Sequence, residues 1–71
     1  MMCNYILITR KQGIRIEYTF PEIKTLHDFA QTVYPKFDEA RQAKPDWTVR
    51  VMREENGERF ATSYIHRPKT S

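Results

Sequence analysis

The strongest constraint on the fold is an amphipathic segment from Thr25 to Ala43, with strand-like sequence on both sides of it. Its apolar residues recur at helical spacing and fall on one narrow stripe, a pattern typical of a helix that buries one face. The stripe consists of Leu26, Phe29, Ala30, Val33, Phe37 and Ala40. Thr25 can cap the first turn, and Asp28 occupies the position of a capping-box partner. The sequence therefore predicts one helix packed on one face of a small sheet.

Pro35 is the residue that conflicts with a regular helix in this segment. It cannot donate a hydrogen bond to the carbonyl of Gln31, and its ring crowds that carbonyl. At about 100° per residue, however, Pro35 falls on the solvent side, opposite Leu26, and the stripe continues in phase beyond it. We expect the proline to bend a continuous helix. The alternative is two short helices with a break at Tyr34-Pro35.

Two strands are predicted before the helix, at Tyr5–Thr9 and Ile14–Phe20. The second alternates apolar and polar residues with the period of two that is typical of a half-buried strand. Its apolar face carries Ile14, Ile16, Tyr18 and Phe20, and its polar face carries Arg15, Glu17 and Thr19. Pro21 is expected to end this strand, because proline has no N–H to contribute to a sheet.

The turn between these strands decides which side chains of the first strand are buried. A three-residue turn, Lys11-Gln12-Gly13, would place Ile6 and Ile8 on the apolar face of the second strand. A two-residue turn would bury Leu7 instead. We expect the three-residue turn, since it buries more apolar surface.

The last two strands are joined by Asn56-Gly57, the strongest short hairpin signal in the chain, because both residues tolerate the left-handed backbone of a type I′ turn. The strand before this turn is expected at Trp47–Glu54. On the helix side, the predicted pairs are Arg53 with Phe60, Val51 with Thr62, Val49 with Tyr64 and Trp47 with His66. On the other side, they are Thr48 with Ile65, Arg50 with Ser63, Met52 with Ala61 and Glu54 with Arg59.

These elements together predict an α+β fold in the order ββαββ. One helix covers one face of a four-stranded antiparallel sheet, and the other face is open. Residues 1–67 are expected to form a single domain, and residues 68–71 a flexible C-terminal tail.

Composition argues against catalysis, a metal site and a membrane span. With 71 residues, the chain is near the lower size limit for burying its own core. One cysteine, Cys3, and two histidines are too few for a transition-metal site. The two glycines, Gly13 and Gly57, are both needed in turns, so the chain has no glycine-rich loop. No apolar run approaches the ~20 residues of a transmembrane helix, and the start of the chain lacks a secretory signal. We expect a cytoplasmic protein that is not an enzyme and binds no cofactor.

The open face of the predicted sheet, on the side away from the helix, is the most informative surface. It is expected to display Tyr5, Leu7, Arg15, Glu17, Thr48, Arg50, Met52, Arg59 and Ile65. Such a mixture of aromatic, aliphatic and arginine side chains is typical of interface hot spots. The candidate partner-binding residues are Tyr5, Leu7, Arg15, Arg50, Met52, Arg53, Arg59 and Ile65.

A net charge of +3 favours an acidic partner for this face. The first hypothesis is a binding protein that docks on a larger acidic protein or nucleoprotein complex. A second is a nucleic-acid-binding module that contacts phosphates with the same arginines. An ordinary solvated face and a homodimer through this face are the remaining alternatives.

In its short length, Met1-Met2 start, ββαββ layout and charged surface, the chain resembles small phage or mobile-element proteins that disable a host complex. Anti-CRISPR proteins and phage inhibitors of host polymerase are examples. The resemblance covers the layout of the whole chain and includes no residue motif. It implies a stoichiometric inhibitor that docks on a host nucleic-acid-processing complex, with Arg15, Arg50, Arg53 and Arg59 as the candidate contacts.

Overall fold

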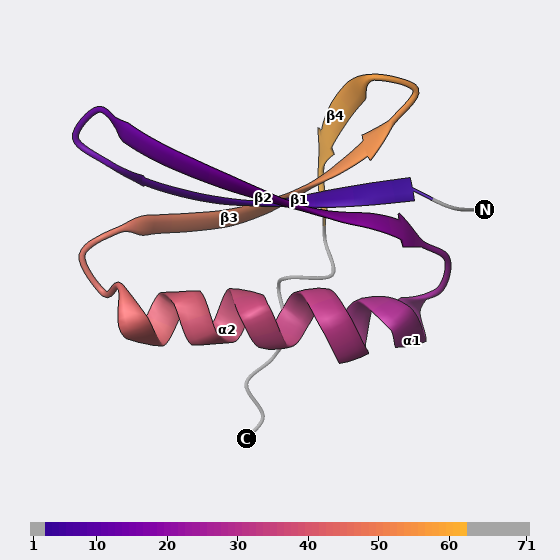
Figure 1. Ribbon diagram of the computed structural model, residues 1–71, viewed down its shortest axis with the longest axis horizontal. Helices are drawn as coiled ribbons and strands as arrows, with labels where there is room; N and C mark the ends of the chain where they lie inside the picture. Colours follow the sequence, from indigo (N-terminus) through magenta and orange to yellow (C-terminus); the bar gives the residue numbers. More distant parts are fainter. Residues whose placement is uncertain (1–2, 63–71) are drawn as a thin grey trace.

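A computed structural model describes residues 3–62 of the chain. The strands form one antiparallel sheet in the order β2-β1-β3-β4, and the helical segments lie across one face of it (Figure 1). In chain order, the elements are β1 (Cys3–Lys11), β2 (Ile14–Ile23), α1 (Leu26–Asp28), η1 (Phe29–Val33), α2 (Tyr34–Ala43), β3 (Thr48–Glu55) and β4 (Glu58–Ala61). The predicted α+β fold in ββαββ order is confirmed.

The helix is continuous from α1 to α2, and its start is capped as the sequence predicts. The Thr25 hydroxyl accepts a hydrogen bond from the Asp28 N–H at 3.1 Å. The Asp28 carboxylate accepts a hydrogen bond from the N–H of Lys24 at 3.3 Å, one residue earlier than in a standard capping box. The contact with Thr25 satisfies an N–H group that the first turn would otherwise leave unpaired, and the contact with Lys24 ties the preceding residue to the helix start.

Pro35 is accommodated by a wide helical turn that precedes it. In η1 the hydrogen bonds span five residues, and the N–H of Tyr34 donates to the carbonyl of Phe29. Such π-type turns absorb irregularities inside α-helices. The helix therefore continues through Pro35, and the alternative of a break at Tyr34-Pro35 is wrong.

The core forms where the middle of the helix meets the sheet. Phe29, Val33 and Phe37, spaced four residues apart, pack with Tyr5 of β1, Ile23 at the end of β2 and Val51 of β3. Leu26 and Ala30 lie together along one flank of the predicted stripe, and both are exposed. The buried stripe is thus narrower than predicted, because the helix residues in the core are those spaced four apart, Phe29, Val33 and Phe37.

The turn between β1 and β2 has two residues, so the predicted three-residue turn is wrong. Gln12 and Gly13 both have a positive φ, 46° and 88°, as a type I′ turn requires. Lys11 therefore pairs with Ile14, and Ile8 pairs with Glu17. The longer turn was expected because it buries more apolar surface, but the chain adopts the shorter one, with Gln12 in a left-handed backbone that glutamine seldom occupies.

This register exchanges the two faces of β1 relative to the prediction. Tyr5 and Leu7 pair with Phe20 and Tyr18 and lie on the helix face. Ile6 and Ile8 lie on the opposite face. The row Ile14, Ile16 and Tyr18 is on the helix face as predicted, but it is exposed because the core is built from β1, β3 and the last residue of β2.

Strand β2 continues through Pro21, which the sequence predicted as its end. Pro21 lies on an edge strand, where a missing N–H does not interrupt the sheet. The register shifts between Cys3 and Tyr5, and Glu22 takes a φ of 60° and donates its N–H to the Asn4 side chain at 3.2 Å. This bulge reverses the side-chain alternation, so that Ile23 pairs with Cys3 and enters the core.

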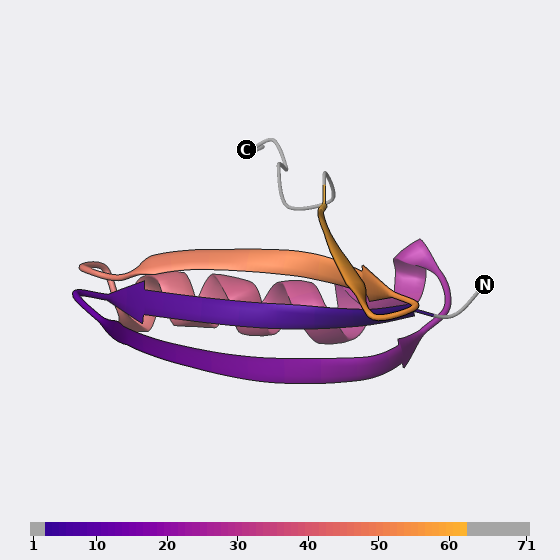
Figure 2. The ribbon, with the colours of Figure 1, turned by 90° about the horizontal axis from the view of Figure 1, so that it is seen from above.

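The second hairpin agrees with the sequence from its turn as far as Ala61, where β4 ends, so the predicted pair of Val51 with Thr62 is not part of the register. Asn56 and Gly57 have φ values of 52° and 80°. The predicted pairs Met52 with Ala61, Arg53 with Phe60 and Glu54 with Arg59 are confirmed. Strand β4 turns away from the plane of the sheet on the side opposite the helix (Figures 1 and 2). The predicted partners Ser63, Tyr64, Ile65 and His66 and the tail at 68–71 lie outside the described residues.

Candidate functional site: the open face of the sheet

The open face is the side of the sheet that faces away from the helix. Its side chains follow from the strand registers: Asn4, Ile6, Ile8 and Arg10 from β1; Arg15, Glu17 and Thr19 from β2; Thr48, Arg50, Met52 and Glu54 from β3; Arg59 and Ala61 from β4. Of the predicted binding residues, this face brings together Arg15, Arg50, Met52 and Arg59.

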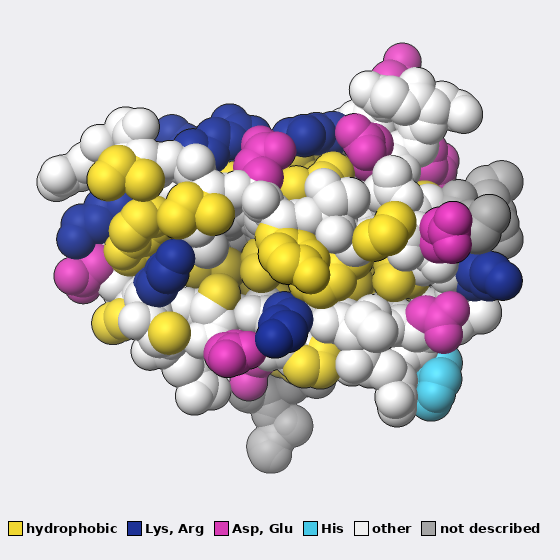
Figure 3. All heavy atoms as spheres, viewed as in Figure 1, with side chains coloured by type: hydrophobic (Ala, Val, Ile, Leu, Met, Phe, Trp, Pro, Cys, Tyr) yellow, Lys and Arg dark blue, Asp and Glu magenta, His cyan; other side chains and the backbone are white. Residues whose placement is uncertain are grey.

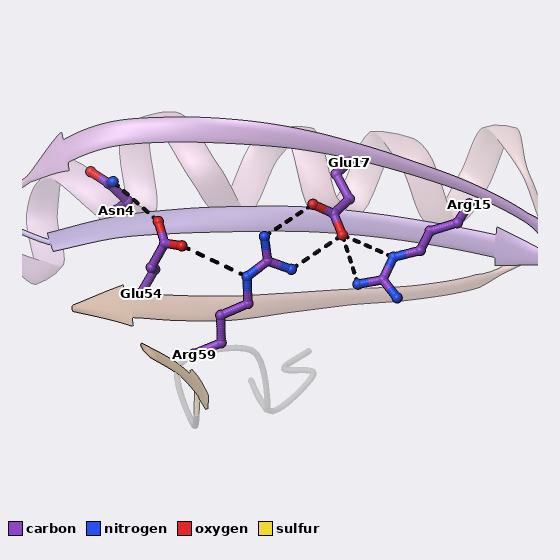
Figure 4. Close-up of polar contacts among 5 residues, drawn as sticks. All are labelled: Asn4, Arg15, Glu17, Glu54 and Arg59. Carbon is purple, nitrogen blue, oxygen red and sulfur yellow. Dashed lines mark hydrogen bonds and ion pairs between the residues drawn. The ribbon is translucent and has the colours of Figure 1, made fainter. Parts of the chain in front are cut away.

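The centre of the open face is buried rather than solvated. Ile6 and Ile8 are only 1% and 3% exposed. A bidentate ion pair crosses this region: Arg59 of β4 donates to both carboxylate oxygens of Glu17 of β2, each at 3.1 Å. Because β1 and β3 lie between these strands, the Arg59 guanidinium is held over β1 (Figure 4). The long polar side chains of the outer strands thus span the apolar centre.

The ion pair belongs to a network that reaches all four strands (Figure 4). Arg15 donates to Glu17 through Nε at 2.8 Å, and its Nη2 lies 2.6 Å from the same oxygen. On the other side, Arg59 Nε lies 3.8 Å from Glu54, whose carboxylate accepts a hydrogen bond from Asn4 at 3.3 Å. Arg15 and Arg59, predicted as free contacts for a partner, are therefore partly neutralised within the chain.

The network changes the acidity of its central carboxylate. Hydrogen bonds from Arg59 and then Arg15 hold the pKa of Glu17 below its ordinary value of 4.5. The same contact with Glu17 raises the pKa of Arg59. Both shifts favour the charged forms, so the ion pair is intact at neutral pH.

We expect Glu17→Gln to destabilise the fold in a pH-dependent way. Because the pKa of Glu17 is lowered in the folded state, its contribution is complete above pH 4.5 and is lost as the pH falls through the folded-state pKa. Thermal unfolding should therefore show a lower midpoint for Glu17→Gln at pH 7, and the difference from wild type should shrink in acid. A difference that stays constant from pH 7 to pH 3 would contradict this prediction.

A basic cluster, Arg10, Arg15 and Arg50, occupies the end of the open face near the Gln12-Gly13 turn. Arg10 pairs directly with Arg15 across β1 and β2, and Arg50 pairs with the neighbouring Ile8. Arg10 and Arg50 are exposed, and neither makes a hydrogen bond or ion pair with another described residue. Like charges directly opposite each other on a sheet are destabilising, so this end of the face favours a bound anion.

The other predicted binding residues lie elsewhere. Tyr5 is in the core and Leu7 is half-buried against it, so their predicted position on the open face is wrong. Arg53 is half-buried on the helix face, with its guanidinium 5.0 Å from the Phe60 ring centre and 3.5 Å from Glu55. Ile65 lies outside the described residues. Sequence reasoning missed Arg10, because the first strand was predicted to end at Thr9.

Within residues 3–62, no three His, Cys, Asp or Glu side chains gather in a way that could hold a metal ion. In the same part of the chain, no helix has the length and apolar character needed to span a membrane. Comparison with known proteins gives no matching family model, no similar curated protein and no similar solved structure.

Proposed function

We propose that this chain is a small non-enzymatic binding protein that docks on an acidic surface of a larger protein through the basic cluster. The proposal is supported by the apposition of Arg10 and Arg15, with Arg10 and Arg50 exposed and without an acidic partner among the described residues. A carboxylate placed between these guanidiniums would relieve their repulsion and form charge-assisted hydrogen bonds.

An acidic protein fits the open face better than a nucleic acid does. Sheets that bind single-stranded nucleic acid stack bases on aromatic side chains, and the described residues of the open face include none. Glu17 and Glu54 lie on the same face and would repel a phosphate backbone that continued across it. A nucleic-acid-binding module that uses the same arginines is the second candidate.

The finer proposal concerns the biological role. The resemblance to small phage and mobile-element proteins supports a stoichiometric inhibitor that acts in the cytoplasm on a host nucleic-acid-processing complex, in defence or transcription. In that role the basic cluster would contact an acidic protein surface of the complex.

The test compares two pairs of charge reversals with equal net charge. The double variant Arg10→Glu, Arg50→Glu reverses the exposed charges of the cluster. It should capture less of the acidic partner protein and bind it with an affinity at least about tenfold lower. Lys24→Glu with Arg41→Glu reverses two exposed charges away from the open face and should leave affinity unchanged. Equal losses in both double variants, or none in either, would overturn the proposal.

Titration with duplex DNA and with single-stranded RNA at rising salt tests the second candidate. Phosphate binding weakens steeply with salt, since bound counterions are released. We expect no binding at physiological salt. Tight binding that falls with salt and is lost in Arg10→Glu with Arg50→Glu would replace protein docking with nucleic-acid binding.

A further inference from the structure

Strand β2 carries an exposed apolar row at the edge of the sheet. Ile14, Ile16 and Tyr18 point to the helix face, yet they are 55%, 47% and 61% exposed. Figure 3 views this edge and shows hydrophobic side chains gathered in a band between the sheet and the helix. Three large apolar side chains exposed along one strand of so small a protein indicate an interaction surface.

A groove continues this row towards α2. It has a volume of about 320 Å³, with Leu7, Tyr18 and Phe20 on the sheet side and Ala40 and Ala43 on the helix side. The Tyr18 and Phe20 rings, whose centroids lie 4.8 Å apart, line its sheet side. Lys36 and Glu39 also line its helix side, with Lys36 Nζ 3.6 Å from Glu39 Oε1. The row and the groove together form one elongated apolar surface.

The backbone of β2 is also available for pairing. Among the described strands, β2 stands at one end of the sheet, with only β1 beside it. In a two-residue hairpin the residues that flank the turn exchange hydrogen bonds, and the pattern then alternates. Starting from the Lys11–Ile14 pair, the N–H and C=O groups of Arg15, Glu17 and Thr19 are therefore directed outwards.

We propose that a second copy of this chain pairs with the first along β2, antiparallel, about a two-fold axis at Ile16. Arg15 and Glu17 carry opposite charges two residues apart on the open face. In this register, Arg15 lies opposite Glu17 of the second copy, and the pairing occurs twice. On the helix face, Ile16 meets Ile16 of the second copy and Ile14 meets Tyr18, so the exposed row covers itself.

Neighbouring two-fold registers are less favourable. An axis at Glu17 would place two carboxylates opposite each other, and an axis at Arg15 would place two guanidiniums opposite each other. Only the axis at Ile16 matches charges on one face and apolar side chains on the other. The two four-stranded sheets then form one continuous sheet across the axis.

The assembly is expected to stop at two copies. Pairing uses the β2 edge of both chains, and the bulge at Pro21 and Glu22 interrupts the outer edge beyond Phe20. Within residues 3–62, the other edge strand, β4, has four residues and turns out of the sheet plane (Figure 2). A short, twisted edge is a poor template for further strands.

The test measures the mass of the full chain by sedimentation over a concentration series. We expect a dimer for wild type. Ile16→Lys should raise the dimer dissociation constant by at least about 100-fold, because it places two lysines at the axis. Leu26→Lys changes an apolar residue away from β2 that is at least as exposed as Ile16, and it should leave the dimer intact. A monomer at all concentrations, or a dimer that survives Ile16→Lys, would overturn the proposal.

Charge complementation tests the register itself. Arg15→Glu makes the centre of the β2 edge wholly acidic, and Glu17→Arg makes it wholly basic, so each variant alone should dimerise poorly. Mixed together, the two variants should form a heterodimer, since both cross-axis pairs again join opposite charges. Absence of a heterodimer from two folded variants would reject the axis at Ile16. Because Ile16→Lys leaves Arg10 and Arg50 unchanged, loss of the dimer is separable from loss of partner binding.

Discussion

Phe29→Ala is expected to remove a large part of the stability of this protein. Phe29 is 2% exposed, and its ring meets the Tyr5 ring edge to face, with centroids 4.8 Å apart. Truncation of a buried phenylalanine costs about 3–5 kcal/mol, since it removes buried area and leaves a cavity. At 0.05–0.15 kcal/mol per residue, a chain of this length has a total stability of roughly 4–11 kcal/mol. The variant should therefore unfold at a clearly lower urea concentration than wild type.

Urea unfolding followed by circular dichroism measures this effect, and Leu26→Ala is the matched control. Leu26 lies on the same helix and belongs to the same sequence stripe, but it is 57% exposed. Its truncation should cost less than about 1 kcal/mol. Equal losses for the two variants would mean that the helix presents the wider predicted stripe to the sheet.

The sequence predicted the parts of the fold that depend on local signals. The helix, the Thr25 cap and the Asn56-Gly57 turn each depend on signals within a few residues, and all three are present in the structure, although the buried stripe of the helix is narrower than expected. The wide turn before Pro35 was not predictable, because a proline in a helix can be accommodated by a bend, a break or a π-type turn. The choice among these depends on packing against the sheet.

The errors on the open face share one physical origin. A single residue in the Gln12-Gly13 turn decided which face of β1 met the helix, and the turn uses a glutamine that carries little turn signal. The pairing of Glu17 with Arg59 further required the strand order, which places these residues on opposite sides of β1 and β3. Neither strand order nor long-range ion pairs follow from a local sequence pattern. The pairing of Arg15 and Arg59 with Glu17 could therefore not be predicted from the sequence.

Ile6→Ala is the second substitution with a large expected effect, and it tests the face exchange directly. Ile6 is almost completely buried beneath the network of the open face, so its truncation should lower the free energy of unfolding by about 2–5 kcal/mol. Ile14→Ala, measured at a concentration where sedimentation shows the monomer, should cost less than about 1 kcal/mol, because Ile14 is exposed at the sheet edge of the single chain. The register predicted from the sequence placed both isoleucines on one buried face and would make the two losses similar. A larger loss of unfolding free energy for Ile6→Ala than for Ile14→Ala would support the register of the structure. In that register the helix covers one face of the sheet, and the arginine–glutamate pairs cover the centre of the other.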